Sequence, residues 1–131
     1  MLKNKEKAFT LIELIAVISI LTVIIAIFLP KIQGFFMEAK KVEVIDQARK
    51  IRMAVVTFEA SNDKKFKDIS VSGYINNTVG AVKNYQPTNK YFEGITIDKI
   101  PDSITLDDIY NIVENGADFN VNSSGVFDKF N

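Results

Sequence analysis

The 131-residue chain contains neither cysteine nor histidine. The missing cysteine excludes disulfides, iron–sulfur clusters and thiolate zinc sites. The missing histidine removes the commonest general base and the commonest transition-metal ligand. Only carboxylates, lysine, tyrosine, serine and threonine remain for chemistry, and no catalytic motif gathers them. We therefore predict that the protein is not an enzyme and holds no metal or other cofactor.

An excess of charge of one sign is also missing, because the formal net charge is zero. The charges are nevertheless uneven: Lys3, Lys5 and Lys7 make the start basic, and the part beyond Asn62 carries more acidic than basic side chains. No stripe of lysine and arginine follows in that part, so we do not expect nucleic acid as a partner. The polarity of charge predicts membrane topology instead.

A long apolar run is what the chain has in abundance. Residues from Leu14 to Leu29 carry no charge, and from Ala8 to Pro30 there is only Glu13. A helix of about 20 apolar residues crosses a bilayer. The basic start places the N-terminus in the cytoplasm by the positive-inside rule, so everything from Lys31 onward is expected outside the membrane.

Two other interpretations of this run stay open. A cleavable secretory signal also begins basic and turns apolar, but its apolar part is only about 7 to 15 residues long, and no small-x-small cleavage site follows here. The second is a signal anchor that holds an extracellular binding protein at the membrane. That alternative gives no reason for a carboxylate at Glu13, because charges inside membrane segments are costly.

A second helical pattern continues after Pro30. Apolar side chains recur mostly three or four residues apart, which predicts an amphipathic helix to about Ser61. The predicted stripe consists of Ile32, Phe35, Phe36, Ala39, Val42, Ile45, Ala48, Ile51, Val55 and Phe58. Pro30 and Gly34 weaken the helix, so we expect a bend or local melting between Ala26 and Gly34, or a simple kink at the membrane surface.

The remaining sequence predicts a small mixed domain. Residues 95–100 alternate and contain β-branched side chains, which predicts a short strand ended by Pro101. Residues 105–116 predict a helix with Thr105 as N-cap and Gly116 just past its end. Two short alternating runs on either side of residues 123–125 predict a hairpin.

These elements together give an α+β fold. A long N-terminal α-helix, with a transmembrane half and an amphipathic half, is predicted to pack on a small antiparallel β-sheet head. The predicted division is a leader at residues 1–8, a transmembrane and assembly helix at 9–30, its amphipathic continuation at 31–61 and the head at 62–131.

Alternating oxygen-bearing side chains in the last part of the chain mimic a calcium loop. Asp118, Asn120 and Asn122 imitate its first ligands, but Ser123 stands where glycine is needed and Lys129 where the acidic twelfth ligand belongs. A strand with alternating polar side chains explains the same pattern. We therefore favour a strand at this position.

The stretch KAFTLIEL, from Lys7 to Leu14, places a small residue and then Phe-Thr-Leu-Ile-Glu before an apolar helix and after a basic leader. It resembles the type III signal of type IV pilins and pseudopilins. The resemblance implies that a prepilin peptidase cuts between Ala8 and Phe9 and then N-methylates Phe9. The glutamate at the fifth mature position falls on Glu13, and Pro30 matches the helix-breaking proline of that family.

The resemblance also implies a function and partners. Glu13 would meet the Phe9 amine of the subunit at the filament base, in a type IV pilus or a pseudopilus of secretion or competence. Expected partners are prepilin peptidase, copies of this chain and other pilins or pseudopilins, the membrane assembly platform with its ATPase, and membrane lipid before assembly. Two departures from the family are Ala8, where glycine is usual, and the missing C-terminal disulfide loop.

Overall fold

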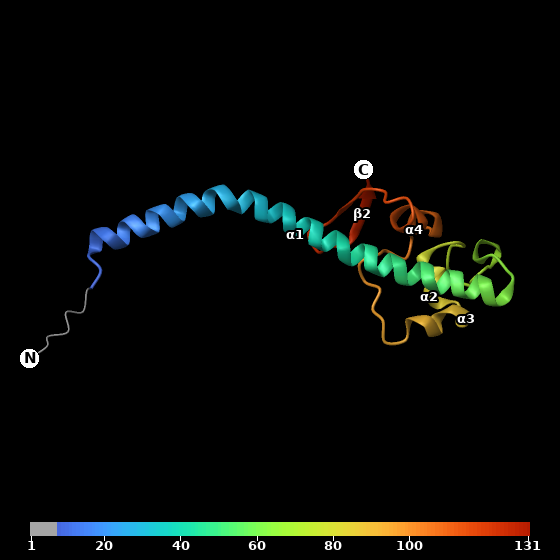
Figure 1. Cartoon of the computed structure of the whole chain (residues 1–131). Helices are drawn as coiled ribbons and strands as arrows, with labels where there is room; N and C mark the ends of the chain where they lie inside the picture. The colour runs from blue at the N-terminus through green and yellow to red at the C-terminus, as the bar shows by residue number, and fades with distance from the viewer. Residues whose placement is uncertain (1–7) are drawn as a thin grey trace, which may run out of the picture. The chain divides into compact units, whose positions relative to one another are not determined.

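A computed structural model describes residues 8–131, and the basic leader residues 1–7 lie outside the described part. The chain forms two compact units, and the boundary between them lies between Phe36 and Met37. Helix α1, Leu11–Asn62, contributes 52 residues and belongs partly to each unit (Figure 1). The first unit therefore consists of the N-terminal part of α1, and the second unit, called the head, contains the rest of the chain.

The first part of α1 is apolar on all sides. Two polar side chains in this part satisfy their hydroxyl groups within the helix. The hydroxyls of Ser19 and Thr22 each donate to the backbone carbonyl four residues earlier, at 2.7 Å. The helix runs through Pro30 and Gly34 without interruption, so the local melting that we considered is not seen. The bend at these two residues stays a prediction.

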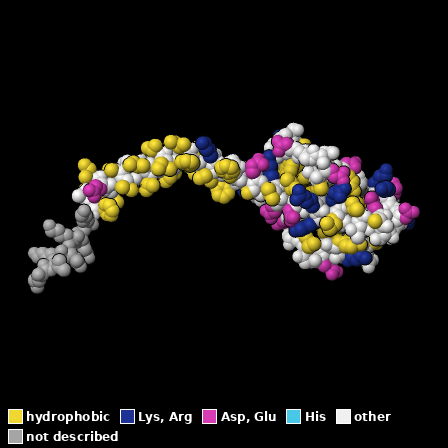
Figure 2. Space-filling model, in the orientation of Figure 1, with side chains coloured by type: hydrophobic (Ala, Val, Ile, Leu, Met, Phe, Trp, Pro, Cys, Tyr) yellow, Lys and Arg dark blue, Asp and Glu magenta, His cyan; other side chains and the backbone are white. Residues whose placement is uncertain are grey.

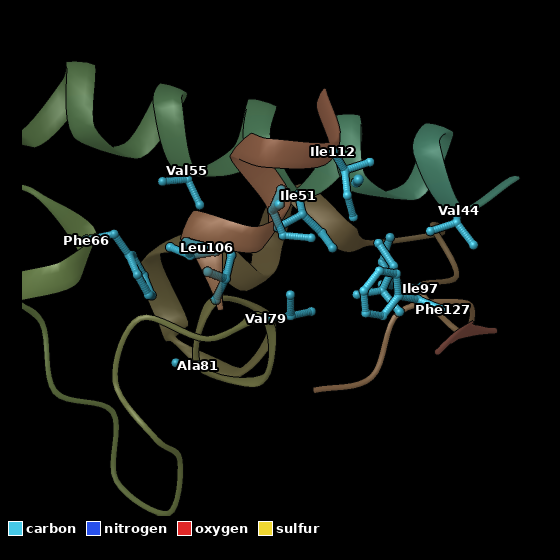
Figure 3. Packing of buried hydrophobic residues seen from close by; sticks show 14 of the residues in the cluster. Val44, Ile51, Val55, Phe66, Val79, Ala81, Ile97, Leu106, Ile112 and Phe127 are labelled. Carbon is cyan, nitrogen blue, oxygen red and sulfur yellow. The ribbon is translucent and has the colours of Figure 1, made fainter. Parts of the chain in front are cut away.

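The head is built on one face of α1. Its buried α1 residues recur at the spacing of an amphipathic helix, and they are Val44, Gln47, Ala48, Ile51, Ala54, Val55 and Phe58. Figure 3 shows Val44, Ile51 and Val55 of this set among the buried side chains of the head. The predicted stripe stays exposed in the described chain at Ile32, Phe35, Phe36 and Ala39. It was wrong at Val42, which is 63% exposed, whereas Val44 is fully buried. A face centred on Ile51 returns to positions 47, 48 and 44 at 3.6 residues per turn, and position 42 points away from it.

Short helices cover that face where the sequence was hardest to interpret. They are the 3₁₀ turn Phe66–Asp68, α2 (Val79–Asn84), α3 (Gln86–Asn89) and a second 3₁₀ turn, Lys90–Phe92. Phe66 is fully buried, and its ring meets those of Phe58 and Tyr85 edge-on at 5.9 Å. Gly80 lets α2 pack closely against Asp102, because a Cβ at position 80 would lie 3.0 Å from the Cβ of Asp102.

The last two predicted elements are confirmed. Helix α4, Leu106–Val113, begins at the N-cap Thr105, whose hydroxyl accepts from the amide of Asp108 at 3.2 Å. Strands β1 (Phe119–Val121) and β2 (Phe127–Phe130) pair antiparallel. The α+β class is therefore confirmed, with a sheet of two short strands in the described chain (Figure 1).

The strand predicted at residues 95–100 does not form, and this prediction was wrong. Ile97 and Ile100 are buried as a strand pattern requires, but Gln47 of α1 takes the place of a neighbouring strand. The side chain of Gln47 accepts from the amide of Lys99 and donates to the carboxylate of Asp98, both at 2.8 Å. The hydrogen bond from Gln47 to the carboxylate of Asp98 is the main reason that the pKa of Asp98 lies below its ordinary value. The segment is thus held to α1 through Gln47, and a further bond joins it to the hairpin, because the amide of Phe127 in β2 donates to the carbonyl of Lys99 at 2.8 Å.

An ion pair fixes the hairpin to α1. The ammonium of Lys41 lies 3.0 Å from a carboxylate oxygen of Asp118, and it also reaches Glu38 at 3.3 Å. The side-chain amide of Asn131 donates to the other oxygen of Asp118. The hydrogen bond between Lys41 and Asp118 raises the pKa of Lys41 and lowers that of Asp118. Opposite charges held this close favour both charged forms.

Replacing Ile51 by alanine tests the central packing of the head. Ile51 is fully buried in the core cluster, so the cavity left by Ile51→Ala is expected to lower the free energy of unfolding by about 2 to 5 kcal/mol. Urea unfolding of the detergent-solubilised chain, followed by tyrosine circular dichroism, measures this change. Val42→Ala removes an exposed side chain of the same helix and is expected to stay within about 0.5 kcal/mol. Equal losses in the two variants would contradict the described core.

The ion pair at Asp118 predicts a dependence of stability on pH. Since folding lowers the pKa of Asp118 below its ordinary value of 3.8, its contribution is present above that value and is lost as the pH falls through the folded-state pKa. We expect Asp118→Asn to flatten the fall in unfolding free energy between about pH 5 and pH 2. Asp128→Asn is the control, because Asp128 has no ion-pair partner within residues 8–131. An unchanged slope in Asp118→Asn would exclude the predicted role.

Candidate functional site

The predicted cleavage site lies just before α1. Residues 8–10 form neither helix nor strand, and α1 begins at Leu11. All three are exposed, and the side chain of Phe9 is 83% exposed. A peptide bond in an exposed segment outside regular structure is the kind that proteases cut. The geometry at Ala8 and Phe9 is therefore suited to cleavage, which stays a prediction.

Glu13 lies in the first turn of α1 and forms a reciprocal pair of hydrogen bonds with Thr10. The amide of Thr10 donates to a carboxylate oxygen of Glu13 at 3.2 Å, and the amide of Glu13 donates to the hydroxyl of Thr10 at 3.3 Å. This arrangement is a capping box, in which the side chain of each residue accepts from the backbone amide of the other. Two amides that have no partner within the helix are thereby satisfied. The carboxylate also lies at the positive end of the helix dipole.

This contact is a role for Glu13 that the sequence analysis missed. Its signal is visible in the chain, since Thr10-Leu11-Ile12-Glu13 is the threonine-x-x-glutamate pattern that precedes an apolar helix. The capping box therefore explains the carboxylate of Glu13 even in a protein that is only anchored in the membrane.

The surroundings of Glu13 are apolar and uncovered. From Leu11 to Leu29 the large apolar side chains are between 44% and 76% exposed, and Figure 2 shows hydrophobic side chains along this part of the helix. An 18-residue window of the helix has a mean hydropathy of 2.9, and none of it is buried. By length and composition the helix can cross a membrane, and a surface this apolar requires lipid or protein to cover it.

The imitation of a calcium loop is explained by contacts within the chain. The side-chain oxygen of Asn122 accepts from the amides of Ser124 and Val126 at 2.9 and 3.0 Å. The carbonyls of Ser123 and Ser124 accept from the ammonium groups of Lys40 and Lys99, at 2.8 and 3.1 Å. Lysine side chains thus lie against the carbonyl oxygens that a cation would use. Asp118, the first ligand of the pattern, faces Lys41 instead.

Comparison with protein families identifies the start of the chain. Residues 3–29 match the family described as the prokaryotic N-terminal methylation motif. No curated protein and no solved structure matches the chain. The match includes Ala8, Phe9 and Glu13 and ends just before Pro30.

The chain therefore carries a prepilin-type signal, as the resemblance to type IV pilins implied. The signal implies processing by prepilin peptidase and assembly with other pilins, and it points to a structural protein and not to an enzyme. Together with the apolar helix, it is consistent with a single-pass membrane-anchored protein. The match ends within α1, so it says nothing about the head.

The capping box predicts a local effect of Thr10. Thr10→Val removes the hydroxyl that accepts from the amide of Glu13 and is expected to weaken the start of the helix by about 0.5 to 2 kcal/mol. Hydrogen exchange of the Glu13 amide in detergent micelles, measured by nuclear magnetic resonance, should become faster. Thr22→Val is the matched control, because that hydroxyl donates within the helix and caps nothing. Unchanged exchange at Glu13 would show that Thr10 is not the cap.

Proposed function

We propose that the protein is a structural subunit of a type IV pilus or a pseudopilus. A prepilin peptidase cuts between Ala8 and Phe9 and methylates the new amino group of Phe9, and the subunit then enters a helical filament through α1. The observation that carries this proposal is the methylation motif over residues 3–29, whose part from Leu11 onward lies on helix α1, where the apolar side chains are exposed on every face.

The charge of Glu13 fits a role that begins with cleavage. A charge in the middle of a membrane segment costs about 3 kcal/mol on insertion scales, which is an upper bound for Glu13 in the first turn of α1, and a nearby cation offsets that cost. Before cleavage, the carboxylate accepts from the amide of Thr10. Cleavage creates an ammonium at Phe9, four residues from Glu13. The carboxylate of an incoming subunit then pairs with the Phe9 ammonium of the subunit at the filament base and sets its axial position.

The exposed apolar side chains of α1 serve two states in this proposal. In the membrane they contact lipid, and in the filament they pack on the same helix of neighbouring subunits. Packing in the filament leaves no apolar surface in water. Pro30 and Gly34 are the proposed bend points, because Pro30 donates no hydrogen bond and Gly34 has open space around its missing Cβ.

The proposal includes a topology and a set of partners. The N-terminus lies in the cytoplasm and the head outside it, and the assembled subunit lies in a surface pilus or a pseudopilus. A membrane assembly platform and its ATPase move the subunit from lipid into the filament. A pilus, a type II secretion pseudopilus and a competence pseudopilus all use these same features.

A second candidate function is a signal-anchored extracellular binding protein. The capping box favours this candidate, because the contact with Thr10 gives Glu13 a structural role that needs no filament. The mass and the N-terminal sequence of the mature protein separate the candidates. N-methylated Phe9 is the expected result, a retained Met1 would support the anchor, and a cut beyond Leu29 would identify a secretory signal.

Glu13→Gln separates the charge of Glu13 from its capping. Glutamine still completes a capping box, but it cannot neutralise an ammonium. We expect Glu13→Gln to be cut and inserted in the membrane as wild type is, yet to be lost from filaments in sheared cell-surface fractions. Thr10→Val keeps the charge without the cap and is the matched control, expected to enter filaments. Wild-type assembly of Glu13→Gln would refute the proposed charge pair.

A further inference from the structure

The outward face of α1 in the head carries an apolar hollow that nothing in the described chain fills. Its volume is about 380 Å³, and its lining residues are Arg49, Arg52, Met53, Val56, Thr57 and Val113. Met53 is 70% exposed and Val56 is 43% exposed, although the opposite face of the same helix turns is fully packed. The hollow therefore offers an apolar floor to another molecule.

The rim of the hollow is basic. Arg49 has no ion-pair partner within residues 8–131, and Arg52 pairs with Glu114 while its guanidinium lies 5.7 Å from the ring centre of Tyr110. Burial is the main cause that raises the pKa of Tyr110, so that ring stays uncharged beneath the guanidinium. An apolar side chain accompanied by carboxylates would match both the floor and the rim.

A projecting loop with exposed apolar side chains and carboxylates in its neighbourhood occurs on the head itself. Ile75 is 74% exposed and Tyr74 is 41% exposed, in the loop before α2. The loop is held in shape: Gly73 takes a φ of +83°, the amide of Tyr74 donates to Val71 at 3.1 Å, and Thr78 donates to the carbonyl of Ile75 at 2.6 Å. A fixed loop loses little entropy when its exposed side chains are buried in a contact.

One carboxylate lies beside this projection, and two more belong to the helix that its loop contacts. Asp102 lines a small recess together with Tyr74 and Ile75. Asp107 and Asp108 lie in the first turn of α4, which meets the same loop where the amide of Leu106 donates to Asn77 at 2.9 Å. Asp102 pairs with Lys83, whereas Asp107 and Asp108 have no ion-pair partner within residues 8–131. The projection is thus acidic and apolar where the hollow is basic and apolar.

We propose that the hollow beside Met53 receives the Tyr74–Ile75 loop of a second copy of this chain. The inference rests on the proposed filament and names a contact between its heads. The two surfaces differ, so the contact is heterologous, and each copy offers one hollow and one loop. Such contacts build open helical assemblies when they do not close on themselves. Opposite charges at the rim favour this pairing over a contact of like surfaces.

The absence of cysteine from the chain allows a direct test by disulfide cross-linking in isolated filaments. Met53→Cys and Ile75→Cys change exposed side chains, which is expected to leave the fold intact. Oxidised filaments of the double variant should give a ladder of dimers, trimers and larger species on a denaturing gel. Filaments of either single variant should give monomers, and a mixture of the two should give dimers and nothing larger. Val42→Cys with Ile75→Cys is the control pair and should not cross-link.

Reversal of charge tests the rim independently. Arg49→Glu in the double-cysteine background should lose most of the ladder, and the further change Asp107→Arg should restore it. Loss that Asp107→Arg does not reverse would contradict the proposed charge complementarity.

The outcomes distinguish the contact from the filament. Filaments of the double-cysteine variant that assemble as wild type does but give no cross-link would overturn this contact and leave the proposed function standing. Doubly linked dimers without a ladder would overturn the heterologous contact, because they indicate a closed symmetric pair. A wild-type chain that forms no filament would count against both the proposed function and this contact.

Discussion

The head depends on the burial of one face of α1 between Val44 and Phe58. Ile51 and Val55 are fully buried there, and the short helices and the hairpin of the head reach the core by packing against that face (Figure 3). Two short strands and helices of four to eight residues have little stability of their own. Their order therefore comes from the helix that they cover, with no disulfide in the chain to assist.

Polar groups of α1 complete what the apolar contacts begin. Gln47 satisfies backbone and carboxylate groups of residues 98 and 99, and Lys40 and Lys41 hold the hairpin through Ser123 and Asp118. Each of these bonds joins parts of the chain that are far apart in sequence. A buried polar group without such a partner would destabilise the head, so the buried Gln47 helps to decide which loop lies against its turn of the helix.

The same helix meets a different requirement at its start. Thr10 and Glu13 satisfy each other's backbone amides at the start of α1, where no water would do so inside a membrane. In the proposed function, cleavage after Ala8 produces an amine four residues from this same carboxylate in the sequence. In that proposal one side chain serves helix formation first and subunit pairing later.

The sequence by itself determined the parts that depend on local order. The apolar run, the carboxylate at Glu13, the N-cap at Thr105 and the turn at Gly125 are all written in neighbouring residues, and the methylation motif lies within residues 3–29. Only the tertiary structure decided that Val44 faces the core and Val42 does not, that residues 95–100 bind to Gln47 and form no strand, and that Met53 and Val56 remain uncovered. Those outcomes depend on contacts between residues distant in sequence, and periodicity within one segment does not specify the partner on which that segment packs.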